Sequence, residues 1–166
     1  MFTYNHQLRV RYSDTDQMGY VYYGNYGNYF EQARADAVRS LGIVYKDIEA
    51  AGIIIPVTRL NIKFIQPAFY DEMLTIKTSI PEMPHRSMLF KYEIYNEKNK
   101  LINKAETHMV FADTHTKLLV TAPALLLEKL KPFFEAPVIE FFDTINPNHI
   151  IEPLLPVHIW KYRKAG

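Results

Sequence analysis

The chain has 166 residues, in which 19 lysines and arginines stand against 18 aspartates and glutamates, and it contains no cysteine. This length predicts one domain that buries a core without disulfides or metal ions. A formal charge of +1 offers no broad basic surface for nucleic acid. The absence of cysteine excludes a disulfide framework, a cysteine-based zinc site and a thiol nucleophile. No apolar run approaches the ~20 residues that span a bilayer, and the first residues lack the apolar core of a signal peptide, so we expect a cytoplasmic protein.

The N-terminal segment predicts a strand followed by a shaped loop. Between residues 6 and 12, the apolar residues Leu8, Val10 and Tyr12 alternate with polar ones, which is the pattern of a half-buried strand. The next segment, residues 13–28, contains aspartates, asparagines and three of the six glycines. Because these residue types favour tight turns, we expect an ordered loop between the strand and the first helix.

Two helices follow this loop. Apolar residues at helical spacing predict a first helix of about four turns. We expect Asn28 to cap it, with Glu31 completing a capping box, and Gly42 to end it in a left-handed conformation. A second helical stretch covers residues 45–51 and ends at Gly52. The longer first helix is the element expected to pack on a sheet.

The central part of the chain predicts that sheet. Four runs alternate between apolar and polar residues and are joined by short turns, namely residues 60–65, 74–80, 88–95 and 101–112. The simplest arrangement of such runs is an antiparallel meander. Thr121 and Pro123 then start a short leucine-rich helix. The whole order predicts an α+β fold, with one long helix against a single curved antiparallel sheet.

This architecture predicts contacts beyond the single domain. A sheet covered by one helix keeps exposed edges, and a second copy commonly covers such an edge, so we expect a homodimer or a homotetramer. Residues 135–166 hold four of the ten prolines together with many large apolar residues. This C-terminal extension is too apolar for a solvated linker. We therefore expect a domain over residues 1–134 and an extension, residues 135–166, that packs on the body or on a partner subunit.

The loop ahead of the first helix is the best candidate for a functional site. It places Asp14 and Asp16 before a glycine-rich approach to a helix N-terminus, where free N–H groups and the helix dipole stabilise negative charge. A carboxylate that faces a carbonyl polarised in this way can act as a base for water or as a nucleophile. The alternative is structural: both aspartates form Asx turns, and the tyrosines of the loop fill a core or an interface.

The same segment resembles the signature of the hotdog-fold thioesterases, in the branch of the 4-hydroxybenzoyl-CoA thioesterases and YbgC-like acyl-CoA thioesterases. The resemblance extends over residues 6–134 and implies a hotdog fold. It is carried by residues 11–16 (RYSDTD), Gly19, Val21, residues 25–26 and residues 29–34 (YFEQAR), with support from residues 65–68 (IQPA), Asp71 and residues 86–87 ahead of Phe90.

The resemblance also implies roles for single residues. Asp16, three residues before Gly19, matches the catalytic carboxylate, and the backbone N–H of Tyr23 matches the oxyanion donor at the start of the long helix. Many YbgC-like members have a histidine at the position of Tyr23, whereas this chain has the tyrosine of the 4-hydroxybenzoyl branch. The candidates for substrate binding are Gly19, Val21, Tyr26, Arg86 and Ser87.

Other candidates have competing explanations. Arg86 and Ser87 match positions that contact the pantetheine or phosphate portion of coenzyme A in the family, but a solvated turn explains Arg86 nearly as well. Glu31 matches the helix glutamate that a related hotdog class uses, but its position after Asn28 fits capping better. Two strand residues and two histidines without metal-ligand spacing complete the set: Arg59, Lys63, His108 and His115.

These observations lead to the hypothesis of an acyl-CoA thioesterase that releases a free acid and coenzyme A. No metal or redox cofactor is expected, since coenzyme A enters as part of the substrate. Asp16 activates water or attacks the carbonyl that the N–H of Tyr23 polarises. Two alternatives stay open: a non-catalytic hotdog module that binds an acyl-CoA or a similar metabolite, and a thioesterase that acts on acyl carrier protein. The presence of Asp16 beside the glycine approach favours an enzyme.

Overall fold

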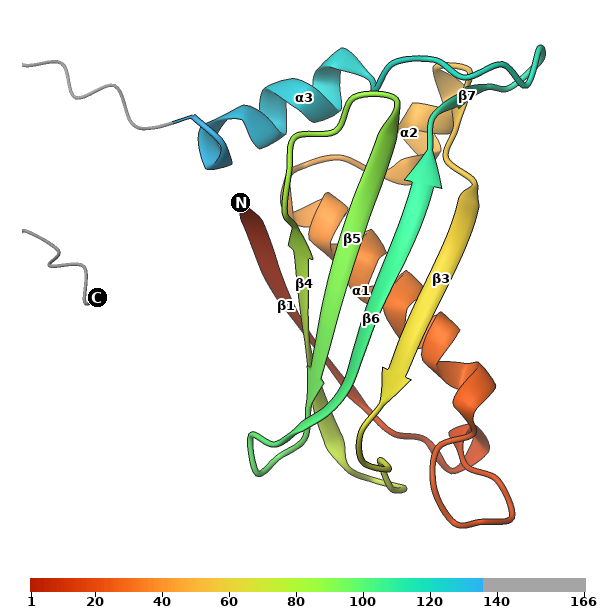
Figure 1. Ribbon diagram of the computed structural model, residues 1–166, viewed down its shortest axis with the longest axis vertical. Coiled ribbons are helices and arrows are strands. Elements are labelled where there is room, and N and C mark those ends of the chain that lie inside the picture. The colour runs from red at the N-terminus through yellow and green to blue at the C-terminus, as the bar shows by residue number, and fades with distance from the viewer. Residues whose placement is uncertain (136–166) are drawn as a thin grey trace, which may run out of the picture.

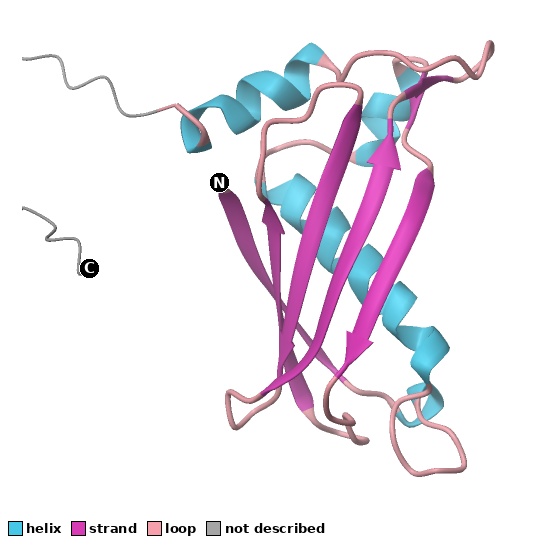
Figure 2. Ribbon diagram, viewed as in Figure 1, coloured by secondary structure: helices cyan, strands magenta, loops and turns pink. Residues whose placement is uncertain are grey.

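A five-stranded antiparallel sheet carries one long helix across one of its faces, in a computed structural model that describes residues 1–135 (Figures 1 and 2). The strands are β1 (Phe2–Arg9), β2 (Ile53–Ile54), β3 (Val57–Phe64), β4 (Met73–Ile80), β5 (Ser87–Tyr95), β6 (Leu101–Val110) and β7 (Ala112–Asp113). The helices are α1 (Tyr26–Ser40), α2 (Tyr45–Ala50) and α3 (Ala124–Leu130), with short 3-10 segments η1 (Tyr12–Asp14), η2 (Tyr23–Asn25) and η3 (Lys131–Phe133). The predicted α+β class is confirmed.

The strand order differs from the predicted meander at one strand. The order in the large sheet is β1-β4-β5-β6-β3, so β4, β5 and β6 follow one another as expected. β3, however, pairs with β6 at the far edge, with Phe64 opposite Asn103. The side of β4 where a meander would place β3 is occupied by β1, which pairs along β4 as far as Arg9 opposite Met73. The meander is therefore wrong for the first of its four runs.

The first strand lies nearer the N-terminus than predicted. β1 spans Phe2–Arg9 instead of residues 6–12. His6 occupies a partly buried position on β1, where its Nδ1 lies 2.9 Å from Oδ2 of Asp36 on α1. Because His6 is polar although it lies on the side of β1 that α1 covers, the alternation of apolar and polar residues does not reveal this part of the strand. At the other end Tyr12 already begins η1, so the chain has left the sheet before the predicted end of the strand.

The long helix starts earlier than predicted and stops where predicted. Its N-cap is Asn25, so the capping box assigned to Asn28 and Glu31 is wrong. The side chain of Asn25 instead donates a hydrogen bond of 2.8 Å to the carbonyl oxygen of Asp14. Gly42 has φ +78°, the left-handed conformation expected at the helix end. The buried residues of α1 are Tyr26, Tyr29, Phe30, Ala33, Ala37 and Val38.

The two ends of the described chain meet at one corner (Figure 1). The amino group of Met1 donates a hydrogen bond of 2.6 Å to the carbonyl oxygen of Phe133, and the rings of Phe2 and Phe133 pack edge to face with centroids 5.0 Å apart. α3 follows Pro123 as predicted. Apart from Glu135, the predicted extension lies outside the described residues. Up to that residue, no helix is both long and apolar enough to cross a bilayer.

Candidate active site

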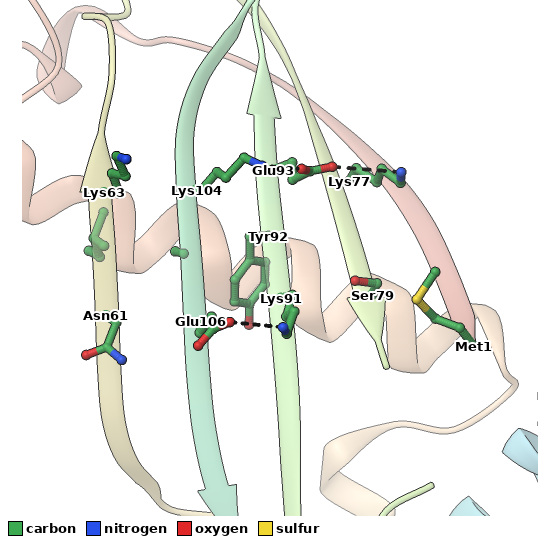
Figure 3. A pocket seen from close by; sticks show the side chains of 12 residues that line it. Met1, Asn61, Lys63, Lys77, Ser79, Lys91, Tyr92, Glu93, Lys104 and Glu106 are labelled. Atoms are coloured by element: carbon green, nitrogen blue, oxygen red, sulfur yellow. Dashed lines mark ion pairs between the residues drawn. The ribbon is translucent and has the colours of Figure 1, made fainter. Parts of the chain in front are cut away.

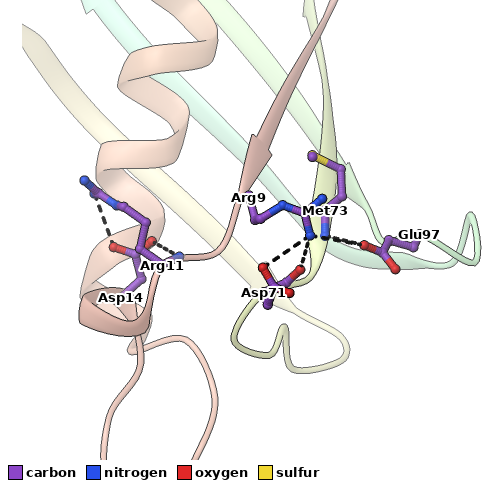
Figure 4. A network of polar contacts seen from close by, with 6 residues as sticks. All are labelled: Arg9, Arg11, Asp14, Asp71, Met73 and Glu97. Carbon is purple, nitrogen blue, oxygen red and sulfur yellow. Dashed lines mark hydrogen bonds and ion pairs between the residues drawn. The ribbon is translucent and has the colours of Figure 1, made fainter.

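A buried carboxylate organises the loop that precedes α1. Asp14 is 5% exposed, and its Oδ2 accepts hydrogen bonds of 2.9 Å from the N–H of Arg11 and from the hydroxyl of Tyr29. Its Oδ1 lies 3.3 Å from Nη2 of Arg11 (Figure 4). The backbone carbonyl of Asp14 also accepts hydrogen bonds from the N–H of Tyr22 and the side chain of Asn25. One residue therefore joins η1, the returning loop and the start of α1.

These contacts hold Asp14 in its charged form. Burial by itself raises the pKa of the Asp14 carboxyl, but hydrogen bonds from the Arg11 backbone and the Tyr29 hydroxyl, with the Arg11 guanidinium, leave that pKa below its ordinary value. Burial, and then the bond to Asp14, raise the pKa of Tyr29. The hydroxyl thus stays a donor and the carboxylate an acceptor. The Asx turn predicted for Asp14 is wrong. The structural role of Asp14 is instead to connect the loop with the start of the helix.

Asp16 opens a tight turn at the tip of the same loop. Its Oδ1 accepts a hydrogen bond of 2.8 Å from the N–H of Met18, so the Asx turn that the structural alternative predicted for Asp16 is confirmed. Its carbonyl accepts the N–H of Gly19 at 2.9 Å, and its own N–H donates to the carbonyl of Tyr20 at 3.1 Å. Gly19 has φ +81°, a backbone conformation that residues with a side chain rarely adopt. The turn therefore depends on glycine, and it fixes the direction of the half-buried Asp16 side chain.

The helix start offers backbone N–H groups next to this turn. η2 leads directly into α1, so Tyr23 is the first residue of a helical run that ends at Ser40. The first N–H groups of a helix have no acceptor within it. Among residues 20–25, backbone hydrogen bonds to other segments or turns use the N–H groups of Val21, Tyr22 and Asn25, and not that of Tyr23. The N–H of Tyr23, like that of Gly24, thus has no backbone acceptor within residues 1–135 and is available to an oxygen atom of a ligand.

A hollow of about 410 Å³ lies beside the helix start. It is formed by the tip of the loop, the start of the helix, and the end of β3 with the segment that follows. Its lining residues are Met18, Tyr20, Val21, Tyr23, Tyr26, Phe64, Ile65, Gln66 and Pro67. Burial raises the pKa of Tyr26 to about 12, so its hydroxyl stays protonated at neutral pH. A mainly apolar, aromatic wall with a few polar groups suits an organic ligand.

Asp16 is absent from the lining of that hollow but lies within electrostatic reach of it. A hydrogen bond with Tyr23 raises the pKa of the Tyr22 hydroxyl, and the negative charge of Asp16 raises it further. The rings of Tyr22 and Tyr23 lie 4.6 Å apart. The loop and helix start thus bring one set of predicted site residues together: Asp16, Gly19, Val21, Tyr23 and Tyr26.

Arg86 and Ser87 lie at the opposite end of the sheet. Ser87 begins β5, whereas Phe64, beside the hollow, is level with Ile94 further along β5. The rise from residue 87 to residue 94 is ~23 Å. Arg86 donates a hydrogen bond of 3.3 Å to a backbone carbonyl in the loop after β7. A single chain therefore does not bring this pair next to Asp16, and its contact with coenzyme A stays a prediction.

The structure changes the argument about Glu31 as an alternative catalytic carboxylate. It lies on the exposed side of α1 and has no capping role. The rise along a helix from Tyr23 to Glu31 is ~12 Å, however, so one carbonyl group cannot contact both. Arg59 and Lys63 alternate with residues that face α1, and so project from the opposite face of the sheet. Within residues 1–135, histidine and acidic side chains form no cluster that could hold a metal ion.

Sequence reasoning missed two parts of the site. The bond between Asp14 and Tyr29 joins residues far apart in the chain, and its signal was an inward-facing tyrosine beside Phe30 in the first helical turns. The second part is the wall after β3. There Ile65 follows Phe64 directly, and both are exposed at 42% and 50%. Two adjacent apolar residues break the alternation of a strand, which was the available signal.

Known proteins resemble this chain in sequence. The family model of the Thioesterase-like superfamily matches residues 10–130. The acyl-CoA thioester hydrolase YbgC of Escherichia coli O6:H1 is 34% identical over 106 residues, which are 64% of this chain and 79% of that protein. The matched family region contains the loop, α1 and the strands of the sheet from β3 to β6, and it ends before the C-terminal extension.

Solved structures of thioesterases also resemble this chain. The DHNA-CoA thioesterase of Staphylococcus aureus superposes with a TM-score of 0.70 at 34% identity, covering 81% of this chain and 85% of that one. The 4-hydroxybenzoyl CoA thioesterase of Pseudomonas sp. strain CBS-3 superposes with a TM-score of 0.70 at 25% identity, covering 78% of this chain and 99% of that one. The predicted hotdog fold is therefore confirmed.

Proposed function

This chain belongs to the Thioesterase-like superfamily, and we propose that it hydrolyses an acyl-CoA to a free acid and coenzyme A. One observation carries the proposal: the Asx turn of Asp16 and the open N–H of Tyr23 stand beside an apolar hollow of about 410 Å³. The substrate class is supported by a relative named acyl-CoA thioester hydrolase and a neighbour named DHNA-CoA thioesterase.

In the proposed reaction the thioester carbonyl lies between Asp16 and the start of the helix. Its oxygen accepts a hydrogen bond from the N–H of Tyr23, and the positive end of α1 stabilises the negative charge that develops there. Asp16 either takes a proton from an attacking water or attacks the carbonyl carbon itself. In both routes the C–S bond breaks, coenzyme A leaves as its thiol, and water supplies the new oxygen. We propose that neither route needs a metal or redox cofactor.

The hollow is the proposed site of the acyl group. Val21 and Tyr26 form its buried side, and Phe64 and Ile65 form a half-exposed side. Apolar and aromatic walls favour the transfer of a hydrocarbon group out of water. The acyl group is thus proposed to be aliphatic or aromatic, with its carbonyl at the helix start and its coenzyme A portion toward the surface.

The proposed active form is a homodimer paired through β3. This edge strand exposes Val57, Leu60 and Phe64 by 48%, 42% and 50%. Unpaired backbone groups and exposed apolar side chains on an edge strand favour association with another strand. In a two-fold antiparallel pair of β3 strands, the Val57 end of one copy lies near the Phe64 end of the other. Arg86 and Ser87 of one copy then approach the hollow of the other.

Turnover of the full chain tests the proposed reaction. A panel of aliphatic and aromatic acyl-CoA substrates is followed by release of free thiol, with acyl carrier protein thioesters as a second arm. We expect acyl-CoA hydrolysis, and a loss of about 10²-fold or more in kcat for Asp16→Asn. Asp47→Asn, on the exposed side of α2, is the matched control. Near-normal turnover of Asp16→Asn contradicts the assignment of Asp16, and tight binding without thiol release supports a non-catalytic binding module instead.

A further inference from the structure

We propose that residues 136–166 of the C-terminal extension pack on the face of the sheet opposite α1, within their own chain. That face contains a hollow of about 560 Å³ on the outer side of β3, β4, β5 and β6 (Figure 3). It is separate from the site described above, since the proposed acyl hollow lies between α1 and the end of β3. The proposal does not depend on the proposed reaction.

The outer hollow carries an excess of positive charge. Four lysines and two glutamates line it: Lys63, Lys77, Lys91, Lys104, Glu93 and Glu106. Glu93 lies 3.0 Å from Nζ of Lys104, and Glu106 lies 3.2 Å from Nζ of Lys91. The lysines of the hollow therefore outnumber its acidic residues by two. Lysine side chains also present apolar stems below their charged ends, so this face suits an apolar segment that carries scattered acids.

The extension has that composition up to Trp160, and its three basic residues, Lys161, Arg163 and Lys164, all follow that position. Between residues 136 and 160 it contains no lysine or arginine, and its acids are Glu140, Asp143 and Glu152. Large apolar residues stand between them, including Phe141, Phe142 and Trp160. Exposing so many apolar side chains to water is unfavourable. Packing the extension on a surface that buries these side chains therefore lowers the free energy of the protein. The three acids before Trp160 favour a basic surface for that part of the extension.

The chain also leaves the domain at the edge of this face. Met1 lines the outer hollow, and its amino group is bonded to the carbonyl oxygen of Phe133 at 2.6 Å. The extension therefore starts near the rim of the hollow. Five strands are only about 20 Å across, whereas a chain of this length spans up to ~100 Å when extended. A tether this short gives a high effective concentration, which favours the chain's own face over that of a second copy.

Zero-length cross-linking of the full chain tests the contact. A carbodiimide joins lysine amines to carboxylates that touch them, and a mixture of ¹⁴N and ¹⁵N chains separates links within a chain from links between chains. We expect same-isotope links from the lysines of the outer hollow to Glu140, Asp143 or Glu152. The pairs Lys104–Glu93 and Lys91–Glu106 are the positive controls. Mixed-isotope links, or control links alone, overturn the proposal.

Thiol labelling gives a second, independent measurement. Because the chain has no cysteine, Lys63→Cys places one thiol in the outer hollow, and Lys98→Cys places one on the exposed turn between β5 and β6. We expect Lys63→Cys to react about tenfold more slowly, as for a docked state favoured by about 1.4 kcal/mol. The triple change Glu140→Gln, Asp143→Asn and Glu152→Gln should remove most of this protection. Equal rates for the two thiols in the otherwise unchanged chain overturn the proposal.

Discussion

The hydroxyl of Tyr29 on α1 donates a hydrogen bond of 2.9 Å to the carboxylate of Asp14 in the preceding loop. Both side chains are almost fully buried, at 2% and 5% exposed. The bond ties the loop that contains Asp16 to α1, which continues the helical run that begins at Tyr23. Neither Tyr29 nor Asp14 lines the hollow, so the geometry of the proposed site depends on a pair that lies behind it.

Removal of the Tyr29 hydroxyl should lower both stability and turnover. Tyr29→Phe leaves a buried carboxylate with one donor fewer, which costs about 1–3 kcal/mol of unfolding free energy. Chemical denaturation measures this loss, and thiol release measures the fall in kcat as Asp16 and Tyr23 lose their alignment. Tyr95→Phe is the control, because it removes a similar bond of 3.0 Å to the half-buried Glu93. Equal losses of stability in the two variants would contradict the role of the buried pair.

The charge of Asp14 should make the fold sensitive to acid. Its pKa is lowered in the folded state from an ordinary value of 3.8, so the unfolded chain binds the proton more readily. The resulting stabilisation is complete above 3.8 and is lost as the pH falls through the lower folded pKa. Asp14→Asn should therefore be less stable than wild type at neutral pH and show a shallower decline in acid. Parallel curves of unfolding free energy against pH would rule this out.

The N–H of Tyr23, and not its side chain, should matter for turnover. Tyr23→Pro removes the N–H at a first helical position, where proline is tolerated, and Tyr22 already has φ −60° and ψ 131°, which suit the residue before proline. We expect kcat to fall by about 10²–10³-fold, as for the loss of one oxyanion donor. Tyr23→Phe keeps the N–H and should stay near wild type. If Tyr23→Phe is as impaired as Tyr23→Pro, the backbone is not the donor.

The edge strand β3 should hold two copies together. Leu60→Lys places a charge on a side chain that is already 42% exposed in one chain, so the fold of that chain should survive. Sedimentation should show a shift from dimer to monomer, together with a loss of thioesterase activity. Leu118→Lys, at a position that is 68% exposed in the loop after β7, is the matched control. A dimer that persists in Leu60→Lys would place the contact elsewhere.

Local signals in the sequence predicted the helices and strands themselves better than they predicted which strands pair with each other. Gly42 and Gly52 mark helix ends because a positive φ is a property of the residue itself. The partner of β3 depends on which side of β4 is free, and that depends on β1, far away in the chain. The start of α1 was misplaced because Asn25 and Asn28 are equally good caps in isolation. Asn25 is selected by its bond to Asp14.

The candidate site shows the same division. The sequence could predict that Asp16, Gly19 and Tyr23 lie near one another, because they belong to one continuous loop with a single turn and a single helix start. Arg86 could not be placed relative to them, because its distance along the sheet is set by strand pairing. The role of Asp14 was missed because, apart from Arg11 three residues before it, its partners lie on the returning loop and on the helix, and no short spacing rule connects these to Asp14.

The separation of Arg86 from the hollow of its own chain has a genetic consequence. If each site combines Asp16 of one copy with Arg86 of the partner subunit, then two defective chains can complement each other. A mixed dimer of Asp16→Asn and Arg86→Ala chains holds one site with both changes and one site with neither. Two inactive parents would thus yield an active hybrid, with the intact site assembled from the unaltered halves of both.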